Sequence, residues 1–313
     1  MILTVTLNPA LDHTLFVDGL KPHDTNRVTR TETDAGGKGL NLSRVAHELG
    51  SETLAICPLG GPAGHSIEGR LRREGVSLEL VEIKGITRTN FSVEDGSGEP
   101  PTTFNGAGPE FAPEEWAAFM GAFEKALARA KFLAMGGSLP PGRAASTYAE
   151  LAGQARARGV EVLVDADGEA MKLAMSVPPD IIKPNRREAE RLLDRTLEDE
   201  SSVIEAAREL SERLSAAGSA RAWALISLGE EGAALASPRG VWFGEPIAVE
   251  AKSTIGSGDS MLAGVLHAIE QGEEAALSLG LACGAATAET DGSEIARRAA
   301  IERLLPLARV REI

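Results

Sequence analysis

The chain has 313 residues, and 32 Lys and Arg against 46 Asp and Glu give it a formal net charge of −14. This length is typical of two folding units, or of one large α/β unit with an appendage, and 43% hydrophobic with 25% charged residues excludes a disordered or fibrous chain. The acidic balance disfavours general binding to nucleic acids or anionic membranes, which depends on Lys and Arg that neutralise phosphates. An anionic small substrate would need cations gathered locally, which predicts a basic cleft inside an acidic surface.

The start of the chain and its rare residue types give few functional signals. No apolar run approaches the ~18 residues of a membrane helix, and the first residues lack the basic region of a signal peptide, so we expect a cytoplasmic protein. Cys57 and Cys283 lie in apolar runs without a CxxC motif, and buried free thiols are their expected state. No metal-ligand spacing connects the five histidines, which are His13, His23, His47, His65 and His267.

The first part of the chain predicts short strands and helices in a βαβ order. Val5–Leu7 is expected as a strand, and polar, β-leaning segments follow at 15–17 and 27–33. Apolar residues then recur at the i, i+3, i+4 and i+7 positions of an amphipathic helix of about two turns, namely Leu42, Val45, Ala46 and Leu49. Beyond this helix the expected order is strand, helix, strand, over residues 53–57, 66–73 and 78–83.

Residues 88–105 interrupt this order with a pattern of their own. Phe91 and Val93 alternate with polar neighbours, residues 95–98 (Asp-Gly-Ser-Gly) favour a turn, and the alternation resumes at Thr103-Phe104. This pattern predicts a hairpin with one solvated face. Together with residues 9–34, we expect it to form a small β-sheet that projects from the main body.

From residue 114 to residue 228, amphipathic helices alternate with apolar strands. The helices are expected near residues 116–123, 148–155 and 203–214, and the strands at 132–135, 160–164, 181–182 and 222–228. Continuous apolar strands between amphipathic helices indicate a parallel sheet that is covered on both faces. Ligands bind such sheets at the carboxyl ends of the strands, so the loops that follow the strands are where we look for chemistry.

The most informative loop is residues 253–260 (Ser-Thr-Ile-Gly-Ser-Gly-Asp-Ser), which opens an apolar helix. Glycines before a helix leave backbone N–H groups aligned with the positive end of the helix dipole, which favours a phosphate or a developing negative charge. Asp259 has two interpretations here, as an N-cap carboxylate or as a general base beside an anion hole. The spacing matches neither a P-loop nor a dinucleotide fingerprint.

Two further loops are rich in glycine. Residues 34–41 (Asp-Ala-Gly-Gly-Lys-Gly-Leu-Asn) place Lys38 among glycines that let the backbone approach a ligand closely, although a flexible turn with a solvated lysine would have the same composition. In residues 136–142 (Gly-Gly-Ser-Leu-Pro-Pro-Gly), Ser138 is a candidate hydrogen-bond donor. A tight proline turn explains this second loop equally well.

A fourth loop follows the strand end at residues 181–182 and opens a helix. Asn185 and Glu188 are three residues apart, which is the spacing of an N-cap and its capping-box partner. The alternative is that the pair organises a hydrated Mg²⁺ ion, since both side chains carry oxygen ligands. The residues alone leave both interpretations open.

In this order and at these intervals, the motifs resemble those of the ribokinase-like sugar kinases, specifically the phosphofructokinase-B branch. The resemblance runs from residues 6–12 (Thr-Leu-Asn-Pro-Ala-Leu-Asp) to Cys283-Gly284, nearly the whole chain. It implies an α/β, ribokinase-like three-layer fold, with a mostly parallel central sheet, helices on both faces and a small β-sheet lid. Its most specific matches are residues 36–41, 137–141, 168–170, 183–185, 227–229 and 256–260.

The resemblance also implies domains and an activity. The expected core, which binds nucleotide and substrate, is residues 1–8, 35–87 and 106–313, and the expected lid is residues 9–34 and 88–105. The chain looks most like the branch members that phosphorylate a ketohexose monophosphate with ATP and Mg²⁺, namely 1-phosphofructokinase and tagatose-6-phosphate kinase. We expect fructose 1-phosphate to be converted to fructose 1,6-bisphosphate, with tagatose 6-phosphate and then fructose 6-phosphate as alternative acceptors.

The residues that match the family's motifs take on implied roles. Asp259 is the implied base, and the N–H groups of Gly256, Ser257 and Gly258 are the implied anion hole. The residues implied to hold the sugar phosphate are Asp12, Gly37, Lys38, Asn41 and Ser138, with Arg88 and Arg27 for its phosphate group. Those implied to bind ATP are Lys183, Asn185, Ser227, Gly229 and Gly284, and Glu188 with Asn185 is implied to hold Mg²⁺ through water.

The sequence departs from the family pattern in two places, and it also bears on the oligomeric state and on an alternative function. Ser257 stands where alanine is usual, which keeps the backbone donors. Residues 165–168 (Asp-Ala-Asp-Gly) replace a stretch that usually carries small hydroxyl residues, and we favour Asp167 as a solvated turn residue, with assistance to Mg²⁺ as the alternative. A lid hairpin at a sheet edge invites pairing, so we expect a homodimer through the lid. A catalytically silent, sugar-phosphate-binding regulatory protein is the alternative from another class, and the intact Asp259 and its glycine loop disfavour it.

Overall fold

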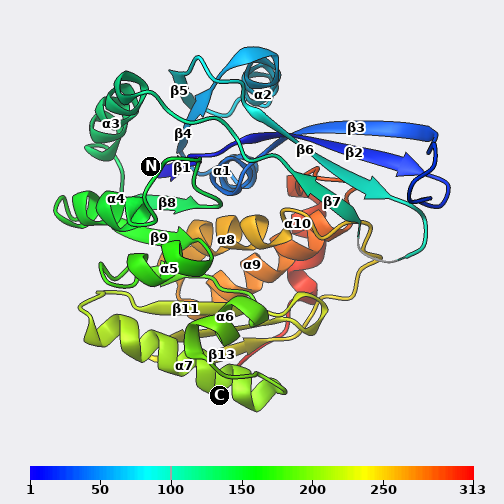
Figure 1. The fold of residues 1–313 in the computed structure, drawn as a ribbon. Coiled ribbons are helices and arrows are strands. Elements are labelled where there is room, and N and C mark those ends of the chain that lie inside the picture. Colours follow the sequence, from blue (N-terminus) through cyan, green and yellow to red (C-terminus); the bar gives the residue numbers. More distant parts are fainter. Residues whose placement is uncertain (99–100) are drawn as a thin grey trace.

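The structure is a computed structural model that describes residues 1–98 and 101–313. Within that part of the chain, ten strands form the main sheet, in the order β14-β13-β12-β11-β10-β9-β8-β1-β4-β5 (Figure 1). The strands from β11 to β5 in this order pair in parallel, and β12, β13 and β14 pair antiparallel at one edge. Their bounds are β1 (Ile2–Val5), β4 (Thr53–Leu59), β5 (Leu78–Glu82), β8 (Phe132–Gly136), β9 (Glu161–Asp165), β10 (Ile181–Ile182), β11 (Trp223–Ser227), β12 (Ala233–Ser237), β13 (Gly240–Gly244) and β14 (Val310–Glu312).

The inner parallel strands are mostly apolar, which lets both of their faces be buried. In β8, Leu133 and Met135 belong to one hydrophobic cluster, whereas Phe132 and Ala134 belong to the cluster on the opposite face. Alternation at every second residue thus supplies two cores from one strand. Cys57 and Cys283 are buried free cysteines, as the sequence predicts.

Helices cover both faces, which confirms the predicted three layers. The cluster on one face includes residues of α3 to α7, and the cluster on the other includes residues of α1, α8, α9 and α10. None of the described helices combines the length and apolarity needed to cross a membrane. The helices are α1 (Lys38–Glu48), α2 (Gly61–Arg73), α3 (Pro113–Leu127), α4 (Thr147–Arg156), α5 (Gly168–Ala174), α6 (Arg186–Leu193), α7 (Glu200–Ala216), α8 (Ser257–Ala268), α9 (Glu273–Ala288) and α10 (Arg298–Leu304).

A second, four-stranded sheet projects from this body, and we call it the lid sheet (Figure 1). Its order is β3-β2-β6-β7, so the predicted hairpin of β6 and β7 does join the strands from the first part of the chain. Residues 99–100 of the predicted lid segment lie outside the described residues. The division of the chain into core and lid domains stays a prediction. The bounds are β2 (Ala10–Val17), β3 (Val28–Gly36), β6 (Arg88–Glu94) and β7 (Thr102–Asn105).

A buried arginine ties the inner end of the lid sheet to the core. Arg44 of α1 is 1% exposed and donates to the Ala35 carbonyl of β3 and to both carboxylate oxygens of Glu74. Asp34 of β3 accepts from Arg44 at 3.3 Å, and Arg70 of α2 lies 2.6 Å from it. The lid therefore leaves the core through a network of paired charges, which is costly to break from one side only.

Several element boundaries differ from those expected. The first strand is Ile2–Val5 rather than Val5–Leu7, because pairing with β4 and β8 begins at Ile2. The first helix has 11 residues, about three turns, and α2 begins five residues earlier than expected. The antiparallel strands β12 to β14 were not predicted. β12 (Ala-Ala-Leu-Ala-Ser) has none of the β-branched or aromatic residues that mark a strand, whereas β13 (Gly-Val-Trp-Phe-Gly) has them and was overlooked.

Candidate active site

The carboxyl ends of β8, β9, β10 and β11 and the N-termini of α1 and α8 bring the predicted loops together. Asp165 is the last residue of β9, Lys183 directly follows β10, and Lys38 begins α1. A small cavity in this region is lined by residues of α1, β8, β9 and α8, among them Lys38, Asp165 and Asp259. The site therefore lies where an open parallel sheet places its ligands.

Asp259 lies in the first turn of α8 and is 8% exposed. Asn41 of α1 donates from Nδ2 to its Oδ2 at 2.9 Å, so residues 218 positions apart meet at this carboxylate. Burial, and secondarily the charge of Asp165, raises the pKa of Asp259 to about 6, against the opposing effect of Lys38. A carboxylate with this pKa is ionised at neutral pH and is more basic than an exposed aspartate, which suits a general base.

The glycine loop before α8 has the backbone shape of an anion site, with one of its donors engaged. Gly256 has φ = 80°, the left-handed conformation that glycine adopts without strain. Ser257 N–H donates to the Thr254 carbonyl over a long 3.3 Å, and the first N–H groups of α8 have no acceptor within the helix. A methyl group at position 258 would lie 3.1 Å from Lys183 Nζ, and one at Gly284 would lie 3.3 Å from the Ser257 carbonyl. Both glycines therefore let neighbouring groups approach the loop.

Two lysines meet at one buried carboxylate. Lys38 Nζ lies 2.8 Å from Asp165 Oδ1, and Lys183 Nζ lies 3.5 Å from Asp165 Oδ2. Burial alone would raise the pKa of Asp165, but Lys183 and Lys38 hold it below the usual value. With Asp259, this cluster contains two cations and two carboxylates. The expected basic cleft is thus corrected here to a charge-balanced one, because the lysines are neutralised by aspartates from two different elements.

On the lid side, Asp12 of β2 projects over the backbone of Gly36. A Cβ atom on residue 36 would lie 1.9 Å from Asp12 Oδ2, so only glycine fits beneath this carboxylate. Asn90 Nδ2 donates to Asp12 Oδ1 at 2.8 Å, and Gly106 N–H donates to Asn90 Oδ1 at 3.1 Å. Burial raises the pKa of Asp12 to about 6, although the bond from Asn90 opposes this. The second oxygen of Asp12 is left for a ligand.

Arg88 begins β6 and is held by main-chain oxygens. Its Nε and Nη2 donate to the Asn8 carbonyl, and its Nη1 donates to the Gly106 carbonyl at 2.9 Å. A guanidinium has five N–H groups, so two remain for an anion. Asn8 also donates to Ser138 Oγ at 3.2 Å, which links the loop after β1 to the loop after β8.

The remaining sugar-side predictions divide into one residue at the site and one away from it. Gly37 is the N-cap of α1, with φ = 131°, directly before Lys38. Arg27 is exposed and directly precedes Val28, which pairs with Val17 at the outer end of the lid hairpin, whereas Ala10 and Gly36 pair at the inner end. The structure does not bring Arg27 to the other site residues of this chain.

On the predicted nucleotide side, Asn185 and Glu188 form the capping box at the start of α6. Asn185 Oδ1 accepts from Glu188 N–H at 2.9 Å, and Glu188 Oε2 accepts from Asn185 N–H at 2.8 Å. Ser227, at the end of β11, forms a parallel bridge with Asn185, and Gly229 follows with φ = 64°. The capping interpretation is confirmed, and each side chain keeps oxygen lone pairs for another ligand.

Comparisons with known proteins agree with this arrangement. The family model of the pfkB family carbohydrate kinases matches residues 5–299. The chain belongs to this family. The 1-phosphofructokinase of Rhodobacter capsulatus is 35% identical over 282 residues, which cover 90% of this chain and 87% of that protein. As a member of the pfkB family, the chain is a sugar-phosphate kinase that transfers phosphate to an alcohol.

Solved structures support the same fold. Phosphofructokinase-2 from Escherichia coli, in complex with fructose-6-phosphate, is 27% identical, with a TM-score of 0.86 over 98% of both chains. Ribokinase from Thermotoga maritima, at 20% identity, has a TM-score of 0.74 over 98% of this chain and 99% of that chain. The predicted ribokinase-like fold is therefore confirmed.

Asp167 departs from the family pattern and lies at the N-terminus of α5. Its Oδ1 accepts from Gly168 N–H, and both carboxylate oxygens lie 2.9 Å from Arg191 Nη2. Burial alone would raise its pKa, but Arg191 and the Gly168 N–H hold it below the usual value. Its side chain is more than half exposed. This geometry is that of the turn residue that the sequence favours over a magnesium ligand.

Three polar residues of this pfkB-family site were given no role by sequence reasoning. Asp165 is the polar residue that ends an apolar strand, and that position alone is a usable signal. Asn8 has the same signal, as the polar residue just beyond β1. Asn90 had no signal, because only the pairing of β2 with β6 places it opposite Asp12.

Proposed function

We propose that this pfkB-family kinase phosphorylates a ketohexose monophosphate with ATP, fructose 1-phosphate before others. The observation that carries the proposal is the buried Asp259 at the N-terminus of α8, which accepts from Asn41 and lies beside the Lys38–Asp165–Lys183 cluster. A base, an anion hole and two cations are the groups that phosphoryl transfer to a hydroxyl needs. The similarity to 1-phosphofructokinase favours the 1-phosphate as the acceptor.

The acceptor sugar would bind between the lid sheet and the core. Asp12 Oδ2, over Gly36, would accept from a sugar hydroxyl, and Ser138 would donate to one. The two free N–H groups of Arg88 and the Lys38 ammonium would bind the existing phosphate. Arg27 lies too far along the lid hairpin to join them within one chain, so its proposed contact requires the site of a second copy.

In the reaction, Asp259 would take the proton of the acceptor hydroxyl while its oxygen bonds to the γ-phosphorus of ATP. The bond from that phosphorus to the bridging oxygen of ADP breaks, and ADP leaves with the electron pair. The N–H groups of Gly256 and Gly258, with that of Ser257 turning from Thr254, would donate to the transferring oxygens. Losing one such donor typically costs about 2.7–4 kcal/mol, and base assistance supplies roughly 10²–10⁴-fold.

Magnesium fits the nucleotide side of the proposed site. Asn185 Oδ1 and Glu188 Oε2 each accept one backbone N–H, and oxygen lone pairs of both side chains remain for ordered waters, which suits an ion that keeps its hydration shell. Bound with ATP, Mg²⁺ would neutralise phosphate charge. Lys183 would contact the phosphates, while Ser227, Gly229 and Gly284 would line the nucleotide pocket.

The test is ADP release with fructose 1-phosphate, fructose 6-phosphate, tagatose 6-phosphate and fructose in parallel. We expect the highest kcat/KM with fructose 1-phosphate and almost none with fructose, which lacks the phosphate that Arg88 and Lys38 would bind. The Asp259→Asn variant is the matched control. No turnover with any of the three phosphates would refute the substrate class and would favour the silent regulatory protein.

Fructose 6-phosphate is the second candidate acceptor. The support is the likeness to the Escherichia coli phosphofructokinase-2 whose structure contains that sugar. Tagatose 6-phosphate, the second acceptor expected from the sequence, moves to third, because this likeness supports fructose 6-phosphate, from which it differs in the orientation of one hydroxyl group. A kcat/KM for fructose 6-phosphate above that for fructose 1-phosphate would reverse our order without touching the rest of the proposal.

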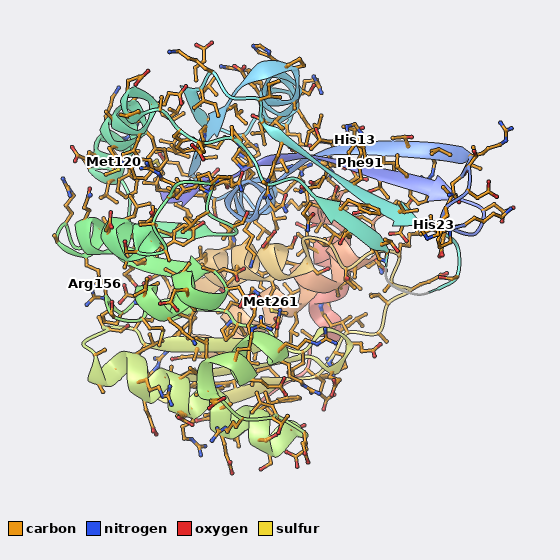
Figure 2. The ribbon with its side chains drawn as sticks, viewed as in Figure 1. His13, His23, Phe91, Met120, Arg156 and Met261 are labelled. Carbon is orange, nitrogen blue, oxygen red and sulfur yellow. The ribbon has the colours of Figure 1, made fainter. Side chains whose placement is uncertain are left out.

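We also propose a homodimer through the lid sheet. Phe91 and Phe104 pair across β6 and β7 and are 41% and 59% exposed, and His13 stacks on Phe91 at 5.5 Å (Figure 2). Exposed aromatics on an unpaired sheet face favour association. Light scattering should give twice the chain mass of 32.8 kDa, and Phe104→Asp should give the monomer. A monomeric native protein would contradict this proposal.

A further inference from the structure

The carboxylate of Asp165 is held from two sides by side chains of different elements. Lys38, at the start of α1, pairs with Oδ1 at 2.8 Å, and Lys183, after β10, pairs with Oδ2 at 3.5 Å. The aspartate side chain is 3% exposed, and Lys183 is 6% exposed. This ion triad joins the lysine that we place on the sugar side to the lysine that we place on the nucleotide side.

Apart from these lysines, little satisfies the carboxylate. Within residues 1–98 and 101–313, Oδ2 has no hydrogen-bond donor, so its partner is the ammonium charge of Lys183. A buried carboxylate without backbone donors is an expensive arrangement for stability alone. Its presence at the end of the sheet where ligands bind therefore points to a role in the reaction.

The backbone of Asp165 is fixed, which gives the carboxylate a defined origin. Gly137 N–H donates to the Asp165 carbonyl at 3.0 Å, and β8 pairs with β9 up to Gly136 and Asp165. A Cβ atom at position 136 would lie 2.2 Å from that carbonyl oxygen, so the two strands approach closely here. The side chain that spans the two lysines thus starts from one of the most constrained points of the sheet.

We propose that Asp165 is a positioning residue for phosphoryl transfer, which holds the ammonium groups of Lys38 and Lys183 beside Asp259 and releases them to the substrate phosphates. The inference rests on the proposed function, because it gives the two lysines their phosphate partners. Without Asp165, two like charges would repel each other and Asp259 would be their nearest carboxylate. The base would then be paired with lysine instead of free to accept a proton.

The central experiment is steady-state kinetics of Asp165→Asn, which keeps the shape and removes the charge. We expect kcat to fall about 100-fold, since misplacing a group by about 1 Å costs this much, with the KM values for both substrates changed less than fivefold. The charged groups that face Asp259 are Asp165 of β9, Lys38 of α1 and Lys183 after β10. Loss of the negative one should move the acid limb of the pH profile to lower pH, which a loss of packing alone would not do.

A double-mutant cycle shows whether Asp165 acts through the lysine. If it does, Lys38→Met/Asp165→Asn should lose less kcat than the product of the two single losses, because only the part that acts through Lys183 remains, whereas independent effects would multiply. Multiplying effects, or native kcat in Asp165→Asn, would overturn the inference. No turnover of the native chain with any of the three sugar phosphates would instead refute the proposed function, so the two failures are distinguishable.

Asp180→Asn is the matched control for folding. Asp180 is also buried, at 3% exposure, but it precedes β10 and so lies at the opposite end of the strands. We expect this variant to melt earlier and to keep native kcat. A similar fall in kcat for both variants would show that loss of a buried carboxylate anywhere in the sheet is enough, and would contradict a specific role for Asp165.

Discussion

The amino and carboxyl ends of the central parallel strands each bury an aspartate, and they hold it in different ways. Asp180, at the amino end of β10, accepts from the backbone N–H groups of Val162 at 2.9 Å and Ala220 at 3.3 Å, and from the Ser219 hydroxyl. Asp165, at the carboxyl end of β9, has two lysine ammonium groups instead. Asp180 thus has two backbone donors, besides the Ser219 hydroxyl and the Arg156 guanidinium 3.6 Å away, whereas Asp165 is paired with lysine side chains.

This difference separates scaffold from chemistry within one sheet. Backbone donors are fixed when the strands form, so their bonds stabilise one conformation and cannot be exchanged. Lysine side chains have rotatable stems, so the same charge can pair with a carboxylate in the free enzyme and with a phosphate in the complex. Substitution of Asp180, at the amino end of the strands, is therefore expected to lower stability and spare turnover. Substitution of Asp165, at their carboxyl end, is expected to lower turnover and spare stability.

The largest effect is expected at Asp259. Asp259→Asn should lower kcat by roughly 10²–10⁴-fold, because the base is lost. Calorimetry should give a sugar-phosphate Kd within about threefold of the native value, since neutral substitution leaves binding groups in place. The comparison would break if this variant kept near-native turnover.

The same variant should be more stable than the native chain at neutral pH. Burial raises the pKa of Asp259 from 3.8 to about 6, so folding favours its protonated form. That contribution is complete below about pH 4, is lost as the pH rises to about 6, and stays lost above. At pH 7, Asp259→Asn should therefore raise the free energy of unfolding by about 1–3 kcal/mol. Urea titrations at pH 7 and pH 4 measure the difference, which should vanish at the lower pH.

The acid limb of kcat/KM should lie near pH 6, about a tenfold loss for each further pH unit. Asp259 must be ionised to accept a proton, and its pKa is raised to about 6 by burial and by Asp165. The phosphate of the substrate also titrates near pH 6, so the diagnostic is the difference between variants. Asp165→Asn should shift the limb to lower pH, and an unshifted limb would separate the two aspartates.

A smaller effect, on stability rather than on turnover, is expected at Asp180, at the amino end of the strands. Val162 N–H and Ala220 N–H donate to different oxygens of Asp180, and Asp180→Asn leaves only one of these acceptors, so it should lower the free energy of unfolding by about 1–3 kcal/mol. Its kcat should stay within about twofold of native. Denaturant titration measures the stability, and steady-state kinetics measures kcat. Loss of turnover in folded Asp180→Asn would contradict the distinction between Asp180 and Asp165.

The smallest effect is expected at Asp167, which is exposed although it is only two residues beyond Asp165. Asp167→Ala removes the N-cap of α5 and an exposed ion pair, and should lower stability by about 1 kcal/mol. Turnover should change less than twofold at saturating Mg²⁺. A raised Mg²⁺ requirement would instead assign this carboxylate to the metal.

The sequence predicted the fold well where the pattern was local and repeated. Apolar strands between amphipathic helices indicated a parallel sheet with two covered faces, and the glycines at 36–37 and 256–258 marked the N-termini of α1 and α8. β12 was missed because it is mostly alanine, and it becomes a strand by pairing with β11 and β13. Tertiary pairing outweighs local propensity there.

The site was predicted residue by residue, but not as a network. Lys38 and Asp165 are 127 residues apart, and nothing in either segment shows that the ammonium and carboxylate meet at 2.8 Å. For the same reason, counting Lys38 and Lys183 as cations suggested a basic cleft, whereas aspartates balance them. Arg27 was predicted to bind the phosphate of the sugar, but it lies at the outer end of the lid hairpin, away from the other site residues. That position depends on the pairing of β2 with β3, which composition does not reveal.

The placement of β1 has a consequence for how the chain is made. Residues 2–5 pair with residues 53–56 on one side and with residues 132–135 on the other. Contacts this distant in sequence form slowly, because a long loop must close first. During synthesis, the first strand to emerge must therefore wait beside β4 until residue 135 has left the ribosome. An isolated N-terminal fragment ending before β8 would expose that open strand edge, and should aggregate where the full chain folds.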